Sequence, residues 1–231
     1  MLGIIGAMEV EVNQIKSELA DIKIIKKAGM EFNSGLLMGK PVVIVRSGVG
    51  KVNAGICAQI LCDIFEVDAI INTGIAGSLK DEINIGDIVL SEDALQHDMD
   101  AVAFGYDIGV IPQMEVSTFK ADKKLITLAE QACKNVCTHI NSFIGRIVSG
   151  DQFISAKEKK KWLTDNFNGY CTEMEGAAIA QAAYLNNVPF LIVRSISDKA
   201  DDSAHMDYPA FESMAIENSV KLIKEIVKNY E

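Results

Sequence analysis

The sequence predicts a single-domain, three-layer α/β fold in which helices flank a twisted, mixed and largely parallel central β-sheet. Two observations predict it. Short apolar runs rich in Val and Ile recur along the 231 residues, with helical stretches between several of them. The runs are also nearly continuous rather than alternating, which is typical of strands that are covered on both faces. Strands that alternate with helices indicate a layered α/β protein.

The elements follow in chain order. Apolar runs predict strands at residues 2–6, 42–45, 69–72, 88–90, 144–148 and 189–193. Apolar residues at helical spacing predict helices at residues 9–20, 51–65 and 122–136, with a further helix-like run at 177–185. In the last helix, apolar residues between Phe211 and Tyr230 form one stripe with Glu and Lys opposite. We expect that helix to pack on the sheet.

Composition indicates one globular domain over residues 1–231, since no linker, charge block or low-complexity tract divides the chain. The net charge of −10 argues against nucleic acid or an anionic membrane as a partner, because both attract basic patches. No apolar run is long enough to span a bilayer, and the first residues resemble a strand rather than a leader. The five cysteines form no CxxC pair or zinc spacing, so we expect reduced thiols in a cytoplasmic protein.

Small or polar residues follow nearly every predicted strand. They read GAMEVE after the first, RSGVGKV and NTGIAGS after the next two, and SGDQFIS and RSISD after the last two. Ligands of α/β proteins collect at the carboxyl ends of strands, so we expect a binding site there. Neither glycine-rich segment is a nucleotide-binding motif: residues 47–52 lack the first glycine and the hydroxyl of a P-loop, and residues 72–79 lack G-x-G. For each, a tight turn that needs glycine is as good an interpretation as a ligand loop.

Carboxylates at these strand ends indicate acid–base chemistry. Glu11 follows the first strand and Asp198 the last. Glu173 and Glu175 lie two residues apart, and an extended chain would place them on one face with Met174 on the other. A single such carboxylate is more often a solvated charge, but carboxylates crowded in one pocket have their pKa values pushed apart.

Seven segments in order resemble one family of hydrolases. They are GIIGAMEVEV (3–12), SGVGKVNA (47–54), INTGIAGSL (71–79), GDIVLSEDALQHDMDAVAFGY (86–106), VSGDQFI (148–154), TEMEGAAIA (172–180) and VRSISDKAD (193–201). From end to end, the chain resembles the 5′-methylthioadenosine/S-adenosylhomocysteine nucleosidases of the purine nucleoside phosphorylase superfamily. The resemblance implies a nucleoside phosphorylase-like domain, a homodimer, an adenine thionucleoside substrate and irreversible hydrolysis of its N-glycosidic bond. It implies no metal or organic cofactor, and the lone His-Asp-Met-Asp stretch at 97–100 is a poor metal motif.

The resemblance also implies residue roles. Asp198 would protonate adenine N7, because adenine is a poor anionic leaving group, and Glu11 would activate the attacking water. Glu175 would bind the ribose hydroxyls. The other substrate contacts that it implies are Met174, Phe153, Ile154, Ser197, Glu173, Arg194, Met8, Val49, Tyr208 and Ile75. The partner subunit would close the pocket with residues near Ala101, Phe104, Tyr106 and Pro112.

The resemblance assigns a more specific role to several of these residues. Phe153 would stack on adenine, while Arg194 and Glu173 would orient the water and the carboxylates. Two positions depart from the family pattern. Ile75 stands where some relatives carry a serine that reaches the ligand, and Tyr208 stands where a phenyl ring is common.

Three alternatives remain open at this stage. A purine nucleoside phosphorylase would carry Gly-Asp-Pro-x-Arg after the first strand, where this chain has GAMEVE, and Glu11 would repel phosphate. A hydrolase of a related purine nucleoside such as futalosine differs only in pocket shape, which a sequence reveals weakly. A non-enzymatic storage or binding relative would be expected to lack Glu11, Glu175 or Asp198, and all three are present.

Overall fold

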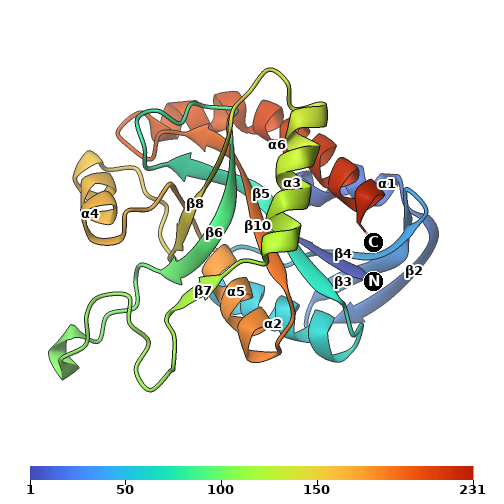
Figure 1. Cartoon of the computed structure of the whole chain (residues 1–231), viewed down its shortest axis with the longest axis horizontal. Helices are drawn as coiled ribbons and strands as arrows, with labels where there is room; N and C mark the ends of the chain where they lie inside the picture. The colour runs from blue at the N-terminus through green and yellow to red at the C-terminus, as the bar shows by residue number, and fades with distance from the viewer. Residues whose placement is uncertain (231) are drawn as a thin grey trace.

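Ten strands form one mixed sheet in the computed structural model, which describes residues 1–230 (Figure 1). The strands are β1 (Leu2–Gly6), β2 (Ala20–Lys27), β3 (Met30–Leu37), β4 (Lys40–Arg46), β5 (Ala69–Ser78), β6 (Ile88–Gln96), β7 (Thr118–Lys120), β8 (Ser142–Ser149), β9 (Cys171–Glu173) and β10 (Phe190–Asp198). The helices are α1 (Glu9–Ser17), α2 (Lys51–Asp63), α3 (Lys123–Val136), α4 (Lys157–Phe167), α5 (Gly176–Leu185) and α6 (Ala204–Asn229), with a 3₁₀ turn η1 (Val102–Phe104). The predicted α/β class is confirmed.

One half of the sheet closes on itself. β10 pairs with both β5 and β6, β8 lies between β6 and β9, and β9 pairs back to β5. These five strands form a closed ring, from which β1, β4, β3 and β2 extend as an open sheet. The sheet is therefore mixed rather than largely parallel, because β6–β10 and β5–β9 are antiparallel pairs, as are the β2–β3 and β3–β4 pairs.

The ring brings strand ends together. β1, β5 and β10 are mutually parallel neighbours, so their carboxyl ends lie at one edge. β9 runs antiparallel to β5 but pairs with its last residues, Gly77 with Thr172 and Ser78 with Cys171. The segments after β8 and β9 therefore reach the same edge as those after β1, β5 and β10.

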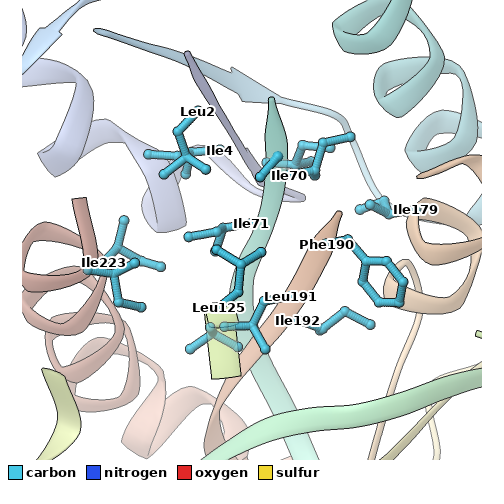
Figure 2. Close-up of a cluster of buried hydrophobic side chains, with 14 of the residues drawn as sticks. Leu2, Ile4, Ile70, Ile71, Leu125, Ile179, Phe190, Leu191, Ile192 and Ile223 are labelled. Atoms are coloured by element: carbon cyan, nitrogen blue, oxygen red, sulfur yellow. The ribbon is translucent and has the colours of Figure 1, made fainter. Parts of the chain in front are cut away.

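Helices cover both faces of the sheet, with α6 and α3 on one side and α2 and α5 on the other (Figure 1). Figure 2 shows the alternation on β10, where Leu191 points toward Leu125 of α3 and Phe190 toward Ile179 of α5. Ile223 of α6 lies on the same side as Leu125. All five side chains are buried, which explains why the strands are continuously apolar.

The elements differ from the prediction in identifiable ways. The predicted strands 69–72 and 189–193 continue as β5 to Ser78 and as β10 to Asp198, because pairing on both sides holds even their polar residues in the sheet. The strands β2, β3, β7 and β9 and the helix α4 were not predicted, since none of the strands contains a long apolar run and α4 is mostly polar. The last helix begins at Ala204. Within the described residues, no helix is long and apolar enough to cross a membrane.

Candidate active site

A cavity of about 410 Å³ opens at the edge where β1, β5, β9 and β10 end. It is lined by Ala7, Met8, Glu11, Val49, Ile75, Ala76, Gly77, Gln152, Phe153, Ile154, Thr172, Glu173, Met174, Glu175, Ser197, Asp198, His205, Tyr208 and Pro209. The lining contains every site residue expected from this chain's own pocket except Arg194. The structure thus brings residues from Ala7 to Pro209, near opposite ends of the chain, into one cavity.

Glu11 lies in the first turn of α1 and turns its carboxylate back toward the end of β1. Its Oε2 accepts hydrogen bonds from the backbone N–H groups of Ala7 (2.7 Å) and Met8 (2.8 Å), and its Oε1 accepts one from Ile75 (3.3 Å). Burial raises the pKa of Glu11, although these N–H groups and the charge of Arg194 partly oppose the rise. A carboxylate whose pKa moves toward neutrality is a better general base.

Asp198 is the last residue of β10 and is almost completely buried. Its Oδ2 accepts a hydrogen bond from the Ser197 hydroxyl (2.9 Å), and its Oδ1 accepts one from the Ala200 N–H (2.8 Å). Burial raises the pKa of Asp198 despite these two donors, and the charges of Asp207 and Asp201 raise it further. Asp198 therefore holds a proton more readily than an exposed aspartate does, and its side chain lines the cavity into which that proton can be donated.

Two glycines of β5 allow the carboxylates of Glu11 and Asp198 to lie directly against the backbone of this strand. A Cβ at Gly74 would stand 2.6 Å from Glu11 Oε1, and one at Gly77 would stand 2.8 Å from Asp198 Oδ1. Neither glycine has a positive φ, so the interpretation of residues 72–79 as a tight turn is wrong. Gly48 and Gly50 do have positive φ, and there the turn interpretation is correct.

Glu173 and Arg194 form an ion pair that is buried on both sides. Arg194 Nη2 donates to Glu173 Oε2, and Gly176 N–H donates to the same oxygen (2.7 Å). Ser149 Oγ donates to Glu173 Oε1. Arg194 is 2% exposed and lies behind the cavity lining, where it also donates to the carbonyl and side chain of Asn72. This position fits the expected supporting role and not a direct substrate contact.

Glu175 occupies the N-cap position of α5 rather than extending β9, and its side chain makes no capping hydrogen bond. The strand ends at Glu173, so Met174 and Glu175 turn into the cavity together, and the expectation that Met174 faces away is wrong. Gly50 N–H donates to Glu175 Oε1 (2.8 Å). Burial, followed by the charge of Glu173, raises the pKa of Glu175 to about 8.

The raised pKa makes Glu175→Gln a test of stability. A carboxyl group whose pKa is about 8 when folded and 4.5 when unfolded stabilises the fold at low pH, and this contribution disappears as the pH rises through 8. Gln carries no charge, so we expect the variant to exceed the wild type by about 1–3 kcal/mol in free energy of unfolding near pH ~9, and to match it near pH ~5. Urea denaturation at both pH values measures this. Glu217→Gln, at an exposed position of α6, is the control, and equal stability of Glu175→Gln and wild type at high pH would contradict the prediction.

Loops at the cavity rim are tied to one another by charges. Lys51 Nζ pairs with Asp98 Oδ1 (2.5 Å), Asp98 Oδ2 accepts from the Asp151 N–H (2.9 Å), and Asp151 Oδ1 accepts from the Lys51 N–H (2.8 Å). This triangle joins the Gly-rich loop that holds Glu175 to the loop that carries Phe153. Both carboxylate oxygens of Asp98 are thus used to hold these loops together. In the part of the chain that the structure describes, no group of three His, Cys, Asp or Glu side chains is placed to hold a metal ion.

The aromatic side of the cavity was only partly predicted. The Phe153 ring lies 5.6 Å from that of His205 and 5.9 Å from that of Tyr208, the latter edge-on at 89°. His205 and Pro209 were missed, because the helical stripe in the sequence begins only at Phe211, and α6 was assigned to packing alone. Gln152 and Thr172 were also missed, although both lie inside the quoted segments. Ala101, Phe104, Tyr106 and Pro112 do not line this chain's own cavity.

Comparison with known proteins gives a consistent result. A family model described as the phosphorylase superfamily matches residues 1–228. The 5′-methylthioadenosine/S-adenosylhomocysteine nucleosidase of Staphylococcus aureus (strain JH9) is 43% identical over 228 residues, which cover 98% of this chain and 99% of that protein.

Two solved structures are also similar over nearly the whole chain. The 5′-methylthioadenosine/S-adenosylhomocysteine nucleosidase of Neisseria meningitidis, solved with methylthio-immucillin-A, has a TM-score of 0.94 and 36% identity, and the match covers 98% of both chains. The futalosine hydrolase of Helicobacter pylori strain 26695 has a TM-score of 0.92 and 33% identity, with 98% of this chain and 96% of that chain covered. On the full-length match and the identity to the curated relative, this chain belongs to the 5′-methylthioadenosine/S-adenosylhomocysteine nucleosidase family of the phosphorylase superfamily.

Proposed function

We propose that this protein hydrolyses the N-glycosidic bond of 5′-methylthioadenosine and S-adenosylhomocysteine, and also of 5′-deoxyadenosine, to adenine and the corresponding ribose. One observation carries the proposal: Asp198 and Glu11, both buried and both with raised pKa values, face one cavity that also contains Glu175. A proton donor, a water activator and a sugar-binding carboxylate are the groups that this hydrolysis needs.

Asp198 serves as the general acid. As the bond between the anomeric carbon and N9 breaks, its electron pair moves into the adenine ring, and the proton of Asp198 is transferred to N7. The hydroxyl of Ser197 and the N–H of Ala200 then stabilise the carboxylate that remains. Adenine leaves as a neutral molecule.

Glu11 serves as the general base. The sugar gains positive charge as the bond breaks, and a water attacks the anomeric carbon while Glu11 accepts its proton. Glu175 exchanges hydrogen bonds with the ribose hydroxyls, and its ionised fraction, which grows as the pH rises toward its pKa of about 8, stabilises the sugar cation by charge. The proton gained by Glu11 and the one lost by Asp198 balance over the cycle, so the reaction consumes only water and needs no cofactor.

The remaining lining residues bind the substrate. Phe153 stacks on the adenine ring, and the buried Ile154 offers backbone hydrogen bonds to its edge. Met174 packs against the sugar, and Met8 and Val49 enclose the 5′-thio group. These assignments rest on the position of each residue in the cavity lining.

The protein functions as a homodimer in this proposal. The segment between β6 and β7, which contains η1, projects from the body of the molecule (Figure 1) and exposes Val102 (54%) and Phe104 (84%). Helices α2 and α5, which pack against each other, expose Val52 (73%) and Leu185 (62%). Exposed apolar residues of this kind are typical of a subunit interface. The partner's projecting segment is then available to close the 5′ end of the cavity.

Val52→Glu is expected to weaken the dimer and to raise KM, because it places a charge in the apolar interface and withdraws the partner's segment from the pocket. Sedimentation velocity at several concentrations measures the assembly. Ile24→Glu, at a similarly exposed position of β2, is the matched control. A monomeric wild type, or an unchanged Val52→Glu dimer, would contradict the assignment.

The five cysteines are free thiols, which supports a cytoplasmic location for the protein in this proposal.

A product assay tests the function. The protein is incubated with 5′-methylthioadenosine with and without phosphate, and the sugar product is identified. Free methylthioribose in both cases is the expected result, whereas a sugar 1-phosphate formed only with phosphate would establish a phosphorylase. Futalosine is the alternative substrate, because its hydrolase shares the fold. A kcat/KM for futalosine above that for 5′-methylthioadenosine would reverse the assignment.

A further inference from the structure

The outer wall of the cavity joins a hydroxyl to a carboxylate that the proposed reaction does not use. Tyr208 lines the cavity and donates its O–H to Glu212 Oε1 (3.1 Å), one turn later on α6. Its oxygen also lies 3.5 Å from Met8 Sδ, which lines the part of the cavity assigned to the 5′-thio group. Glu212 therefore stands directly behind the hydroxyl at the end of the cavity where a 5′ substituent extends.

This wall carries negative charge without a compensating cation. Burial raises the pKa of Tyr208, and the charges of Glu212, Glu11 and Asp198 raise it further, so the phenol stays a neutral donor. In residues 1–230, no Lys, Arg or His nitrogen lies within 4.0 Å of the Glu212 carboxylate. The buried guanidinium of Arg194 is already paired with Glu173. A cation at this end of the cavity is attracted by the Glu212 carboxylate.

We propose that Glu212, which lies behind the Tyr208 hydroxyl, makes the outer end of the cavity selective for 5′-alkylthioadenosines whose tail ends in an ammonium group. The inference rests on the proposed function and deepens it by naming the charge preference at the 5′ position. Glu212 lies behind Tyr208 and does not itself line the cavity, so an ammonium at the end of a short alkyl chain that passes Met8 and Tyr208 is attracted by its charge, whereas a neutral tail gains only apolar contact. A tail carboxylate is repelled, so an amino-acid tail, which holds both charges, gains less than a simple amine.

Three synthetic substrates of similar length test the preference: the 3-aminopropylthio, butylthio and 2-carboxyethylthio analogues of 5′-methylthioadenosine. The wild type is expected to show a kcat/KM about 3- to 10-fold higher for the amine than for the butyl compound, with the carboxylate lowest. The preference should shrink at high salt, because salt screens the attraction between the Glu212 carboxylate and the ammonium group.

Comparing ratios within each variant removes any general loss of activity. Glu212→Gln is expected to bring the amine-to-butyl ratio close to one and to raise the relative rate of the carboxylate. Tyr208→Phe is expected to keep the amine preference, because Glu212 retains its charge. Glu217→Gln, which is exposed and pairs with Lys221 farther along α6, is the matched control and should keep the wild-type ratio.

The outcomes separate this inference from the proposed function. Equal kcat/KM values for the amine and butyl compounds in the wild type would overturn the inference, as would a preference that survives Glu212→Gln. Either result leaves hydrolysis of 5′-methylthioadenosine intact. Failure to hydrolyse 5′-methylthioadenosine itself would instead overturn the proposed function.

Discussion

Asp198→Asn is expected to bind 5′-methylthioadenosine with unchanged affinity and to lose about 10²–10⁴-fold in kcat, because an amide cannot protonate N7. The fold should survive. The amide oxygen still accepts from the Ala200 N–H, and the Ser197 hydroxyl can rotate to accept from the amide nitrogen. Equilibrium binding together with single-turnover kinetics separates affinity from chemistry. Asp202→Asn, at an exposed neighbouring position, is the control.

The pH profile gives a second measurement on the same variant. A general acid with a raised pKa is protonated at low pH and loses its proton as the pH rises, so Asp198 accounts for the alkaline limb of kcat/KM. That limb should vanish in Asp198→Asn while the acidic limb remains. Wild-type turnover, or an unchanged alkaline limb, would remove Asp198 from the mechanism.

Glu11→Gln is expected to lower kcat by about 10²–10⁴-fold for the opposite reason, since the amide cannot accept the proton of the attacking water. Its oxygen can keep the hydrogen bonds from Ala7 and Met8, so the first turn of α1 should remain formed. The acidic limb of the pH profile should lose the contribution of Glu11, which works as a base only when it is ionised, and keep that of Glu175, whose charge also requires loss of a proton. Glu9→Gln, on the same turn but half exposed, is the matched control.

A change of leaving group distinguishes the two residues. A 4-nitrophenyl 5-methylthioriboside releases a stable phenolate that needs no protonation. It should restore much of the rate to Asp198→Asn, whereas Glu11→Gln should stay slow because water activation is still required. The reverse pattern would exchange the two roles.

The position of the site followed from the sequence because it depends on local pattern. GAMEVE, NTGIAGS and RSISD each follow an apolar run, and parallel pairing of β1, β5 and β10 places all three together. Their small residues are needed where they stand, as the close approach of Glu11 to Gly74 shows. The apolar run that forms a strand and the polar residues that follow it are both local features of the sequence, so a single sequence is enough to predict them.

The closed ring of strands could not be predicted in the same way. It depends on the pairing of β10 with both β5 and β6 and on the three residues of β9, which form a strand only because β8 and β5 lie on either side. Tertiary context also decides the role of α6. Its apolar stripe predicts packing, but the turn before that stripe places Tyr208 over the cavity. Burial of Arg194 was equally invisible, since an arginine in a sequence is usually exposed.

The pairing of Arg194 with Glu173 restricts how this chain can change over generations. Losing the arginine alone leaves a buried carboxylate beside Glu11 and Glu175 with no opposite charge, at a cost of about 3–5 kcal/mol, a large part of a typical protein's stability. Losing Glu173 alone leaves the buried guanidinium of Arg194 without its paired carboxylate. Because either single substitution destabilises the protein, we expect Arg194 and Glu173 to change only together. Across descendants of this gene, we expect both residues to be kept or both to be replaced together.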